Sequence, residues 1–263
     1  MRRIEFADGE RTASAVVAGE GTPAVLLPGF LQSAQRFVDA GWVDALAIDF
    51  QVVAIDPAGY GEASKRHDPA DYTADAFVSD LFEIYDLLGI EQAHLVGYSQ
   101  GSGRACYLAH RYPGRVRSLV FGGAPLFDQG ARFRDLGFDV DGLYAQAIDS
   151  LKASDWQAFW EVFPAPLSDE TKRFLESVND PVSAGYVLES TRSAFPPFEP
   201  PSVPTMAYWG SGEIFHDANV TAAAEAGIEA HVVDGEHDGA FSGVQAAMDA
   251  IAPFLTANQP PSQ

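Results

Sequence analysis

The chain has 263 residues, of which 47% are hydrophobic and 20% charged, so it can build a packed core and is not expected to be disordered. Its 37 acidic residues against 16 basic ones give a formal net charge of −21. Such a surface repels nucleic acid and anionic lipid, so neither is an expected partner.

The cysteine content and the apolar runs of the sequence indicate the cellular compartment. Cys106 is the single cysteine, so neither an internal disulfide nor a cysteine-based metal site is expected. The N-terminal sequence MRRIEFADGE lacks the apolar run of a secretory signal. No apolar stretch approaches the roughly 20 residues that a transmembrane helix needs. We therefore expect a cytoplasmic protein that does not enter a membrane.

Strand patterns begin at the N-terminus. Residues 4–18 predict a β-hairpin that turns at Asp8-Gly9, because an Asp-Gly pair favours the positive φ of a tight turn. Further along, short apolar runs each end in Gly, Pro or Asp, a pattern typical of strands buried on both faces of a parallel sheet. These runs are residues 24–30, 50–56, 93–97, 116–123, 205–210 and 230–235. Helical patterns alternate with them, so the sequence predicts an α/β fold.

Two of the helical patterns have recognisable ends. Residues 73–89 carry an apolar stripe, with Thr73 suited to the N-cap and Gly89 to the stop. The final helix is expected to begin at a capping box formed by Ser242 and Gln245, and to be kinked by Pro253. Residues 259–263 are expected to form a flexible tail.

One connection is much longer than the others. The segment between residues 123 and 203 far exceeds the roughly dozen residues that a β–α–β crossover needs. We interpret residues 124–203 as a helical cap or lid over the strand ends. The rest of the core, residues 1–123 and 204–258, then forms one discontinuous domain.

The cap segment contains helix signals of its own. Ser154 and Gln157 predict a capping box, and Asp180-Pro181 predicts a second helix start. Trp156, Phe159, Trp160 and Phe163 follow a helical spacing. This stripe is expected first to pack the cap, and in part to line a substrate pocket.

The strongest chemical signal is Gly97-x-Ser99-x-Gly101, which lies between a predicted strand and a predicted helix. A serine in that context sits on a sharp turn that exposes its hydroxyl, so Ser99 is the candidate nucleophile. The alternative is a purely structural turn. The spacing does not match G-x-G-x-x-G, so dinucleotide binding is not expected.

A nucleophilic serine needs a base, and His237 is the best candidate. It lies in DGEHDGAF, a glycine-rich loop directly after the last predicted strand. His216, in the loop after the preceding strand, is the alternative. The other four histidines fall in strands, in a helix or in a polar loop: His94, His231, His110 and His67.

The base in turn needs an acid that fixes its tautomer. Glu213 follows the 205–210 strand and precedes His237, which gives the order serine, acid, histidine along the chain. Asp217 and Asp128 remain as alternatives at this point.

Together these segments resemble the α/β-hydrolase family over nearly the whole chain. LLPGF resembles its oxyanion loop, DPAGYGEAS its D-x-x-G-x-G-x-S stretch, and GYSQG its nucleophile elbow. YWGSGE and GEH resemble its acid and histidine loops. The resemblance implies the α/β-hydrolase fold, with an eight-stranded, mostly parallel sheet flanked by helices and a helical cap.

The resemblance also implies site residues. These are a catalytic triad of Ser99, His237 and Glu213, and an oxyanion hole made by the backbone N–H groups of Phe30 and Gln100. Two positions depart from the family pattern: Pro28-Gly29 stands where His-Gly is usual, and the acid is more often Asp. The oxyanion loop must therefore be supported in another way.

We expect a cofactor-free serine hydrolase, without a metal, that cleaves an ester, thioester or lactone of a small to medium apolar substrate through an acyl-enzyme. Alternatives on the same triad are a carbon–carbon bond hydrolase, an amidase or peptidase, and a perhydrolase. An alternative of another class is a ligand receptor that uses the hydrolase pocket. Serine at the elbow argues against the dehalogenases and epoxide hydrolases of the family, which use aspartate there.

The candidate pocket residues are Tyr98, Trp156, Phe159 and Trp160. The cap is expected to control substrate choice and not the chemical step.

Overall fold

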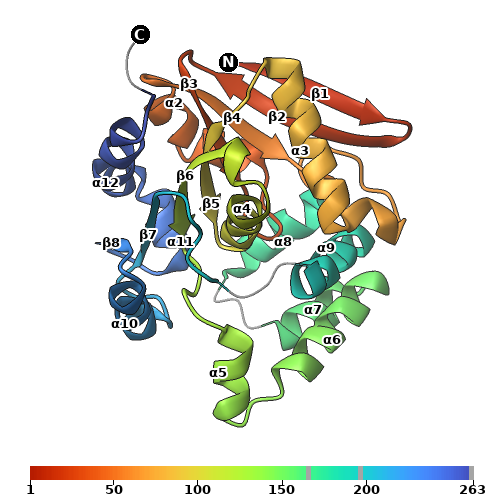
Figure 1. Ribbon diagram of the computed structural model, residues 1–263. Coiled ribbons are helices and arrows are strands. Elements are labelled where there is room, and N and C mark those ends of the chain that lie inside the picture. The colour runs from red at the N-terminus through yellow and green to blue at the C-terminus, as the bar shows by residue number, and fades with distance from the viewer. Residues whose placement is uncertain (164–166, 195–197, 261–263) are drawn as a thin grey trace.

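The computed structural model describes residues 1–163, 167–194 and 198–260, and its strands form one eight-stranded sheet (Figure 1). Their order across the sheet is β1-β2-β4-β3-β5-β6-β7-β8. The strands are β1 (Arg2–Asp8), β2 (Arg11–Ala18), β3 (Thr22–Leu27), β4 (Phe50–Asp56), β5 (Ala93–Tyr98), β6 (Val116–Gly122), β7 (Thr205–Gly210) and β8 (Glu229–Val233). Strands β3 to β8 pair in parallel, while β2 runs antiparallel to β1 and β4. The predicted mostly parallel sheet is confirmed.

The N-terminal hairpin forms where the sequence predicts it. Asp8 pairs with Arg11 at its end, and Gly9 takes a φ of +63° in the turn. A side chain at that φ is strained, so the Asp-Gly pair accounts for the turn.

Helices cover both faces of the sheet. They are α1 (Ala34–Asp39), α2 (Trp42–Leu46), α3 (Ala74–Leu88), α4 (Gln100–Arg111), α5 (Gln129–Asp135), α6 (Val140–Lys152), α7 (Trp156–Val162), α8 (Asp169–Val178), α9 (Pro181–Ala194), α10 (His216–Ala226), α11 (His237–Ser242) and α12 (Val244–Ala257). One buried cluster contains side chains of α3 and α4, and the other contains side chains of α1, α2 and α12. Neighbouring residues of β3 alternate between them, because successive side chains of a strand point to opposite faces. The central strands are thus buried on both faces, as predicted.

Strand β8 departs from that prediction. It lies at the edge of the sheet, pairs only with β7, and buries only Val233. The expectation that residues 230–235 are buried on both faces is wrong, since an edge strand has a neighbour on one side only.

Two helix starts and one helix end lie where the sequence predicts them. The Thr73 side chain accepts a hydrogen bond from the backbone N–H of Ala76 at 3.2 Å, and Gly89 ends α3 with a φ of +67°. Asp180 likewise accepts from the Ser183 N–H at 2.8 Å at the start of α9. These two predictions are confirmed.

Both predicted capping boxes are wrong. Asp155, not Ser154, caps α7, and its carboxylate accepts from the Ala158 N–H at 2.9 Å. Helix α12 starts after Gly243 without a side-chain cap, because Ser242 is the last residue of α11. In both cases a neighbouring residue takes the position that the sequence pattern assigns to a serine.

Helices α5 to α9, here called the cap helices, follow β6 and precede β7. Figure 1 shows α6 to α9 grouped together on one side of the sheet. Residues 195–197, within the expected proline-rich return, and residues 261–263 of the expected tail lie outside the described residues.

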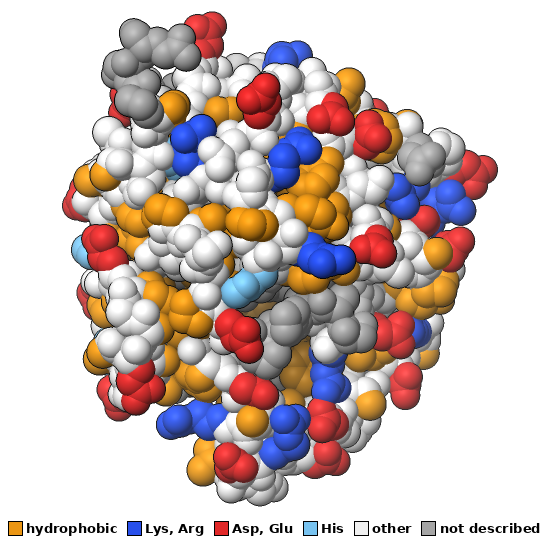
Figure 2. Space-filling model, in the orientation of Figure 1, with side chains coloured by type: hydrophobic (Ala, Val, Ile, Leu, Met, Phe, Trp, Pro, Cys, Tyr) orange, Lys and Arg blue, Asp and Glu red, His pale blue; other side chains and the backbone are white. Residues whose placement is uncertain are grey.

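The surface carries the acidic excess of the sequence. On the face shown in Figure 2, acidic and basic side chains are interspersed with small hydrophobic areas. Across the part of the chain that the structure describes, no helix has both the length and the apolar character needed to cross a bilayer.

Buried His94 makes the stability of this fold dependent on pH. Its side chain is fully buried in β5, and its Nδ1 lies 2.7 Å from Ser118 Oγ. Burial, helped by the nearby Arg117, lowers the pKa of His94 from 6.5 to about 4. Below pH 6.5 the unfolded chain therefore binds a proton that the folded chain does not. The free energy of unfolding is expected to fall as the pH drops from 6.5 to 4, by about 3 kcal/mol in total from this group.

Urea unfolding between pH 7.5 and pH 4.5 checks this expectation. His94→Gln should flatten the pH dependence relative to the parent. Ser118→Ala is the matched control, because it removes the same hydrogen bond but keeps the titrating ring, and it should keep the steep dependence. An equally steep dependence in His94→Gln would refute the assignment.

Candidate active site

Ser99 sits on a strained turn between β5 and α4. Its φ of +53° and ψ of −121° lie outside the regions that L-residues favour, and its N–H donates to the Gly122 carbonyl at 2.8 Å. A Cβ on Gly97 would lie 2.5 Å from the Gly101 carbonyl oxygen, and one on Gly101 would overlap the Leu27 carbonyl. Both glycines are thus required by close backbone contacts. Strain of this kind persists only where the surrounding structure enforces it, and it concentrates at functional sites.

His237 and Glu213 are brought together from two separate loops. Glu213 follows β7, His237 starts α11 after β8, and His237 Nδ1 lies 2.8 Å from Glu213 Oε1. The Glu213 side chain is only 7% exposed, whereas that of His237 is 44% exposed. Because Nδ1 faces the carboxylate, Nε2 is the ring nitrogen left for another partner.

Tyr98 contacts His237 through both its hydroxyl and its ring. Its hydroxyl donates a hydrogen bond to the His237 carbonyl oxygen, and the two rings lie 5.1 Å apart. Burial raises the pKa of Tyr98, and the negative charge of Glu213 raises it further, so the phenol stays protonated as a donor. Tyr98 is fully buried, so its contacts support the histidine loop rather than an open pocket wall.

The alternative acids and base have other contacts. Asp128 caps α5, where its carboxylate accepts from the Ala131 N–H at 2.7 Å. Asp217 is exposed in the first turn of α10. His216 Nδ1 accepts a hydrogen bond from Trp209 Nε1 at 3.1 Å. The geometry therefore favours Glu213 as the partner of His237.

The segments that carry the two expected oxyanion donors, Phe30 and Gln100, both adjoin Ser99. Gln100 is the first residue of α4, so its N–H has no acceptor within the helix. A Cβ on Gly29 would lie 3.3 Å from Ser99 Cβ, so the loop that carries Phe30 passes directly beside Ser99.

A residue not predicted for the site supports that loop. Asp56, at the end of β4, is fully buried, and its Oδ1 accepts from the Ala34 N–H at 2.6 Å. It thereby caps α1, the helix that follows the oxyanion loop, while its Oδ2 pairs with Arg3 at 2.9 Å. This carboxylate fixes the start of α1, four residues after Phe30. Its signal in the sequence was an acid closing an otherwise apolar strand.

The cap aromatics belong to one packed cluster. Phe159 is fully buried, and it packs edge-on against Phe30 of the expected oxyanion loop with ring centroids 6.2 Å apart. Trp156 and Trp160 both contact Phe159, stack on each other with ring centroids 6.0 Å apart, and line a groove of about 420 Å³ between α7 and α8. The cap aromatics thus contact the expected oxyanion loop through Phe159 and through Phe163, whose ring centroid lies 5.8 Å from that of Phe30.

Comparison with known proteins adds an independent finding. A family model described as the alpha/beta hydrolase fold matches residues 22–243. A fluoroacetate dehalogenase from Burkholderia sp. is 37% identical over 115 residues, which are 43% of this chain and 37% of that protein. A 2-hydroxymuconate semialdehyde hydrolase from Pseudomonas sp. (strain CF600) is 37% identical over 110 residues, 41% of this chain and 38% of that protein. The similarity thus spans less than half the length of these relatives.

Among solved structures, the enol-lactonase from Burkholderia xenovorans LB400 superposes with a TM-score of 0.77. The superposition covers 96% of this chain and 100% of that chain, at 18% identity. At this identity the likeness concerns the fold alone.

Proposed function

The chain belongs to the α/β-hydrolase fold family, and on this basis we propose that it is a serine hydrolase acting on an ester, thioester or lactone of a small to medium apolar molecule. The observation that supports this most directly is the 2.8 Å contact between His237 Nδ1 and Glu213 Oε1, in a protein whose Ser99 occupies a strained strand-to-helix turn. A histidine held by a buried carboxylate is the arrangement that activates a serine hydroxyl.

The proposed reaction uses only side chains and backbone groups of this chain. Ser99 Oγ attacks the substrate carbonyl carbon while His237 Nε2 takes the hydroxyl proton. The N–H groups of Phe30 and Gln100 donate to the oxyanion, and His237 then returns the proton to the leaving group. Water, deprotonated by His237, then attacks the acyl carbon. The bond from that carbon to Ser99 Oγ breaks, His237 returns the proton to Oγ, and the acid leaves. Glu213 stays ionised and stabilises the imidazolium in both halves.

Other reactions remain outcomes of the test rather than parts of the proposal. Carbon–carbon bond hydrolysis, amide or peptide cleavage and perhydrolysis would use the same three side chains. A serine at position 99 lacks the carboxylate that could form the alkyl-enzyme ester expected for dehalogenation or epoxide opening. A ligand receptor would retain the pocket without turnover, since a fold does not by itself imply activity.

A fluorophosphonate probe with a substrate panel tests the proposal. We expect rapid covalent labelling of Ser99, and turnover of some p-nitrophenyl esters of increasing acyl length or of lactones. Labelling without turnover of esters, thioesters or lactones would point to one of the other reactions. Absence of labelling in the folded protein would contradict an activated serine.

The cap aromatics are expected to set acyl-chain preference. Phe163→Ala and Trp160→Ala should change the ranking of kcat/KM across a series of p-nitrophenyl esters, because Phe163 packs on Phe30 and Trp160 packs on Phe159. Phe174→Ala is the matched control, since Phe174 also lies on a cap helix but is 61% exposed. An equal loss on every ester, with the fold intact, would argue against this role.

A further inference from the structure

The side chain of Gln100, directly after the nucleophile, is held at both ends of its amide. The hydroxyl of Tyr60, in the segment after β4, donates to Gln100 Oε1. Gln100 Nε2 in turn donates to Thr191 Oγ1 on cap helix α9, at 2.6 Å. One amide therefore connects the nucleophile turn to the core on one side and to the cap on the other.

The hydrogen bonds of this connection can run in one direction only. The Thr191 hydroxyl donates its proton to the Val187 carbonyl at 2.9 Å, so towards Gln100 it can only accept. Tyr60 is only 1% exposed, and burial raises the pKa of its phenol against the opposing effect of Arg104, so its hydroxyl stays a donor. The amide oxygen must then face Tyr60 and the amide nitrogen must face Thr191.

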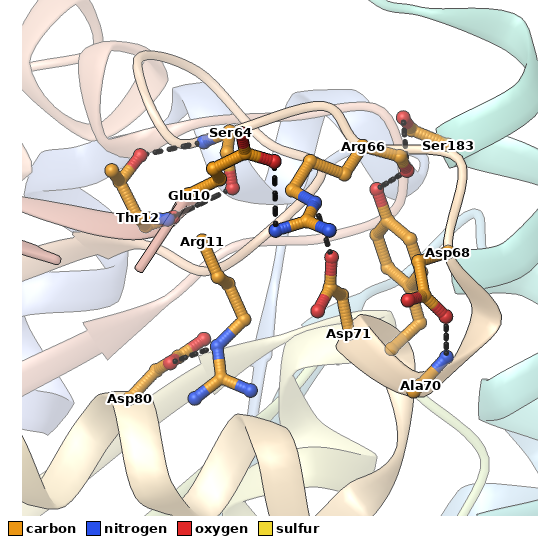
Figure 3. Close-up of polar contacts among 11 residues, drawn as sticks. Glu10, Arg11, Thr12, Ser64, Arg66, Asp68, Ala70, Asp71, Asp80 and Ser183 are labelled. Carbon is orange, nitrogen blue, oxygen red and sulfur yellow. Dashed lines mark hydrogen bonds and ion pairs between the residues drawn. The ribbon is translucent and has the colours of Figure 1, made fainter. Parts of the chain in front are cut away.

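The same core segment also positions helix α9. The Tyr72 hydroxyl and the Ser183 hydroxyl both donate to the Arg66 carbonyl, at 2.5 and 3.4 Å. Figure 3 shows Ser183 next to Arg66. The rings of Tyr72 and Tyr186 stack with centroids 5.6 Å apart. The first half of α9 thus rests on the segment after β4, and that segment also supplies Tyr60.

Arg66 is itself fixed by charge. Its guanidinium lies 3.2 Å from Asp71 and 3.6 Å from Glu10, and Figure 3 shows it between these two carboxylates. The carbonyl that accepts the hydrogen bonds of Tyr72 and Ser183 therefore belongs to a residue whose side chain is held by two ion pairs. Helix α9 is consequently held at a defined position relative to Gln100.

We infer that Thr191 is a positioning residue for catalysis: through the Gln100 side chain it holds the Gln100 backbone N–H at the oxyanion site. This inference rests on the proposed function and gives the cap a part in the chemical step, beyond substrate choice. A donor stabilises an oxyanion only within about 2.7–3.1 Å, so small displacements of the peptide reduce the rate. The strained φ of Ser99, one residue earlier, makes this peptide dependent on its surroundings.

The test compares Thr191→Val, which keeps the shape of the side chain but removes the hydroxyl, with Thr191→Ser, which keeps the hydroxyl. For Thr191→Val we expect kcat to fall by about three- to tenfold, the scale of one neutral hydrogen bond, with KM nearly unchanged. The loss should be the same for short and long acyl esters, and Thr191→Ser should recover most of it. Glu189→Ala is the control on the same helix, because it removes an ion pair of 2.7 Å with Lys152, inside the cap, that does not reach Gln100, and it should change kcat by less than about twofold.

Three results would overturn the inference. They are an unchanged kcat in Thr191→Val, a loss confined to KM or to some acyl lengths, and an equal loss in Glu189→Ala. Failure of the proposed function is recognised separately, as absence of turnover that depends on Ser99. The inference is then judged by NMR, where hydrogen exchange of the Gln100 backbone N–H should be faster in Thr191→Val than in Glu189→Ala.

Discussion

Ser99→Ala is expected to abolish fluorophosphonate labelling and to lower kcat by on the order of 10⁴-fold or more, with the fold intact. The reason is geometric as well as chemical, because the turn that holds Ser99 at a φ of +53° presents this one hydroxyl beside the oxyanion loop. The measurement is single-turnover and steady-state hydrolysis of the best ester or lactone found in the panel.

The fold of the Ser99→Ala variant must be checked by circular dichroism and thermal unfolding. Alanine keeps the Cβ and relieves none of the φ strain, so the turn should remain. Ser102→Ala is a useful comparison, because Ser102 Oγ is buried and bonds the Gly122 carbonyl at 2.7 Å, so its loss should lower stability but not remove labelling. Near-normal turnover by a folded Ser99→Ala protein would exclude Ser99 as the nucleophile.

Glu213→Gln is expected to cost on the order of 10³–10⁴ in kcat, by analogy with other triad acids. The amide nearly matches the carboxylate in shape, but its NH₂ group can donate to Nδ1 of His237. That favours the tautomer with the proton on Nε2, which then cannot accept the Ser99 proton. Raising the pH should not restore the rate, since an amide does not ionise, and the pH–rate profile of the variant checks this directly.

Asp128→Asn and Asp217→Asn are the matched controls for this prediction. Asp128 caps α5 and Asp217 is exposed on α10, so both variants should stay within about tenfold of the parent. A large loss in Asp128→Asn with little effect of Glu213→Gln would move the acid to the loop after β6 and refute the assignment.

The features predictable from the sequence are those with a local cause. The turn at Asp8-Gly9, the Thr73 cap and the Gly89 stop each depend on residues within a few positions of one another, and all three form as predicted. The central strands can also be predicted from the sequence, because a continuous apolar run is stable only when both faces of the strand are buried. The order of the elements along the chain then placed the loops of Ser99, Glu213 and His237 after three strands of a parallel sheet.

What the sequence did not reveal depends on partners far apart in the chain. The apolar run of β8 predicts an interior strand, but the order of strands in the sheet places β8 at the edge. Asp56 caps a helix 22 residues before it, and Thr191 reaches a glutamine 91 residues away. No periodicity encodes such contacts, because they arise only when the packed elements bring the groups together.

The position of β8 as the last strand along the chain has a consequence for how the protein folds during synthesis. The chain from β8 onwards supplies the proposed base His237 and also part of the core, since Ile251 and Leu255 of α12 are fully buried. During N-to-C synthesis the turn that carries Ser99 emerges long before this last segment. A nascent chain would therefore hold the proposed nucleophile, Ser99, without the proposed base. We expect ribosome-bound chains stalled before β8 to resist fluorophosphonate labelling, and labelling to begin only once α12 has emerged and packed.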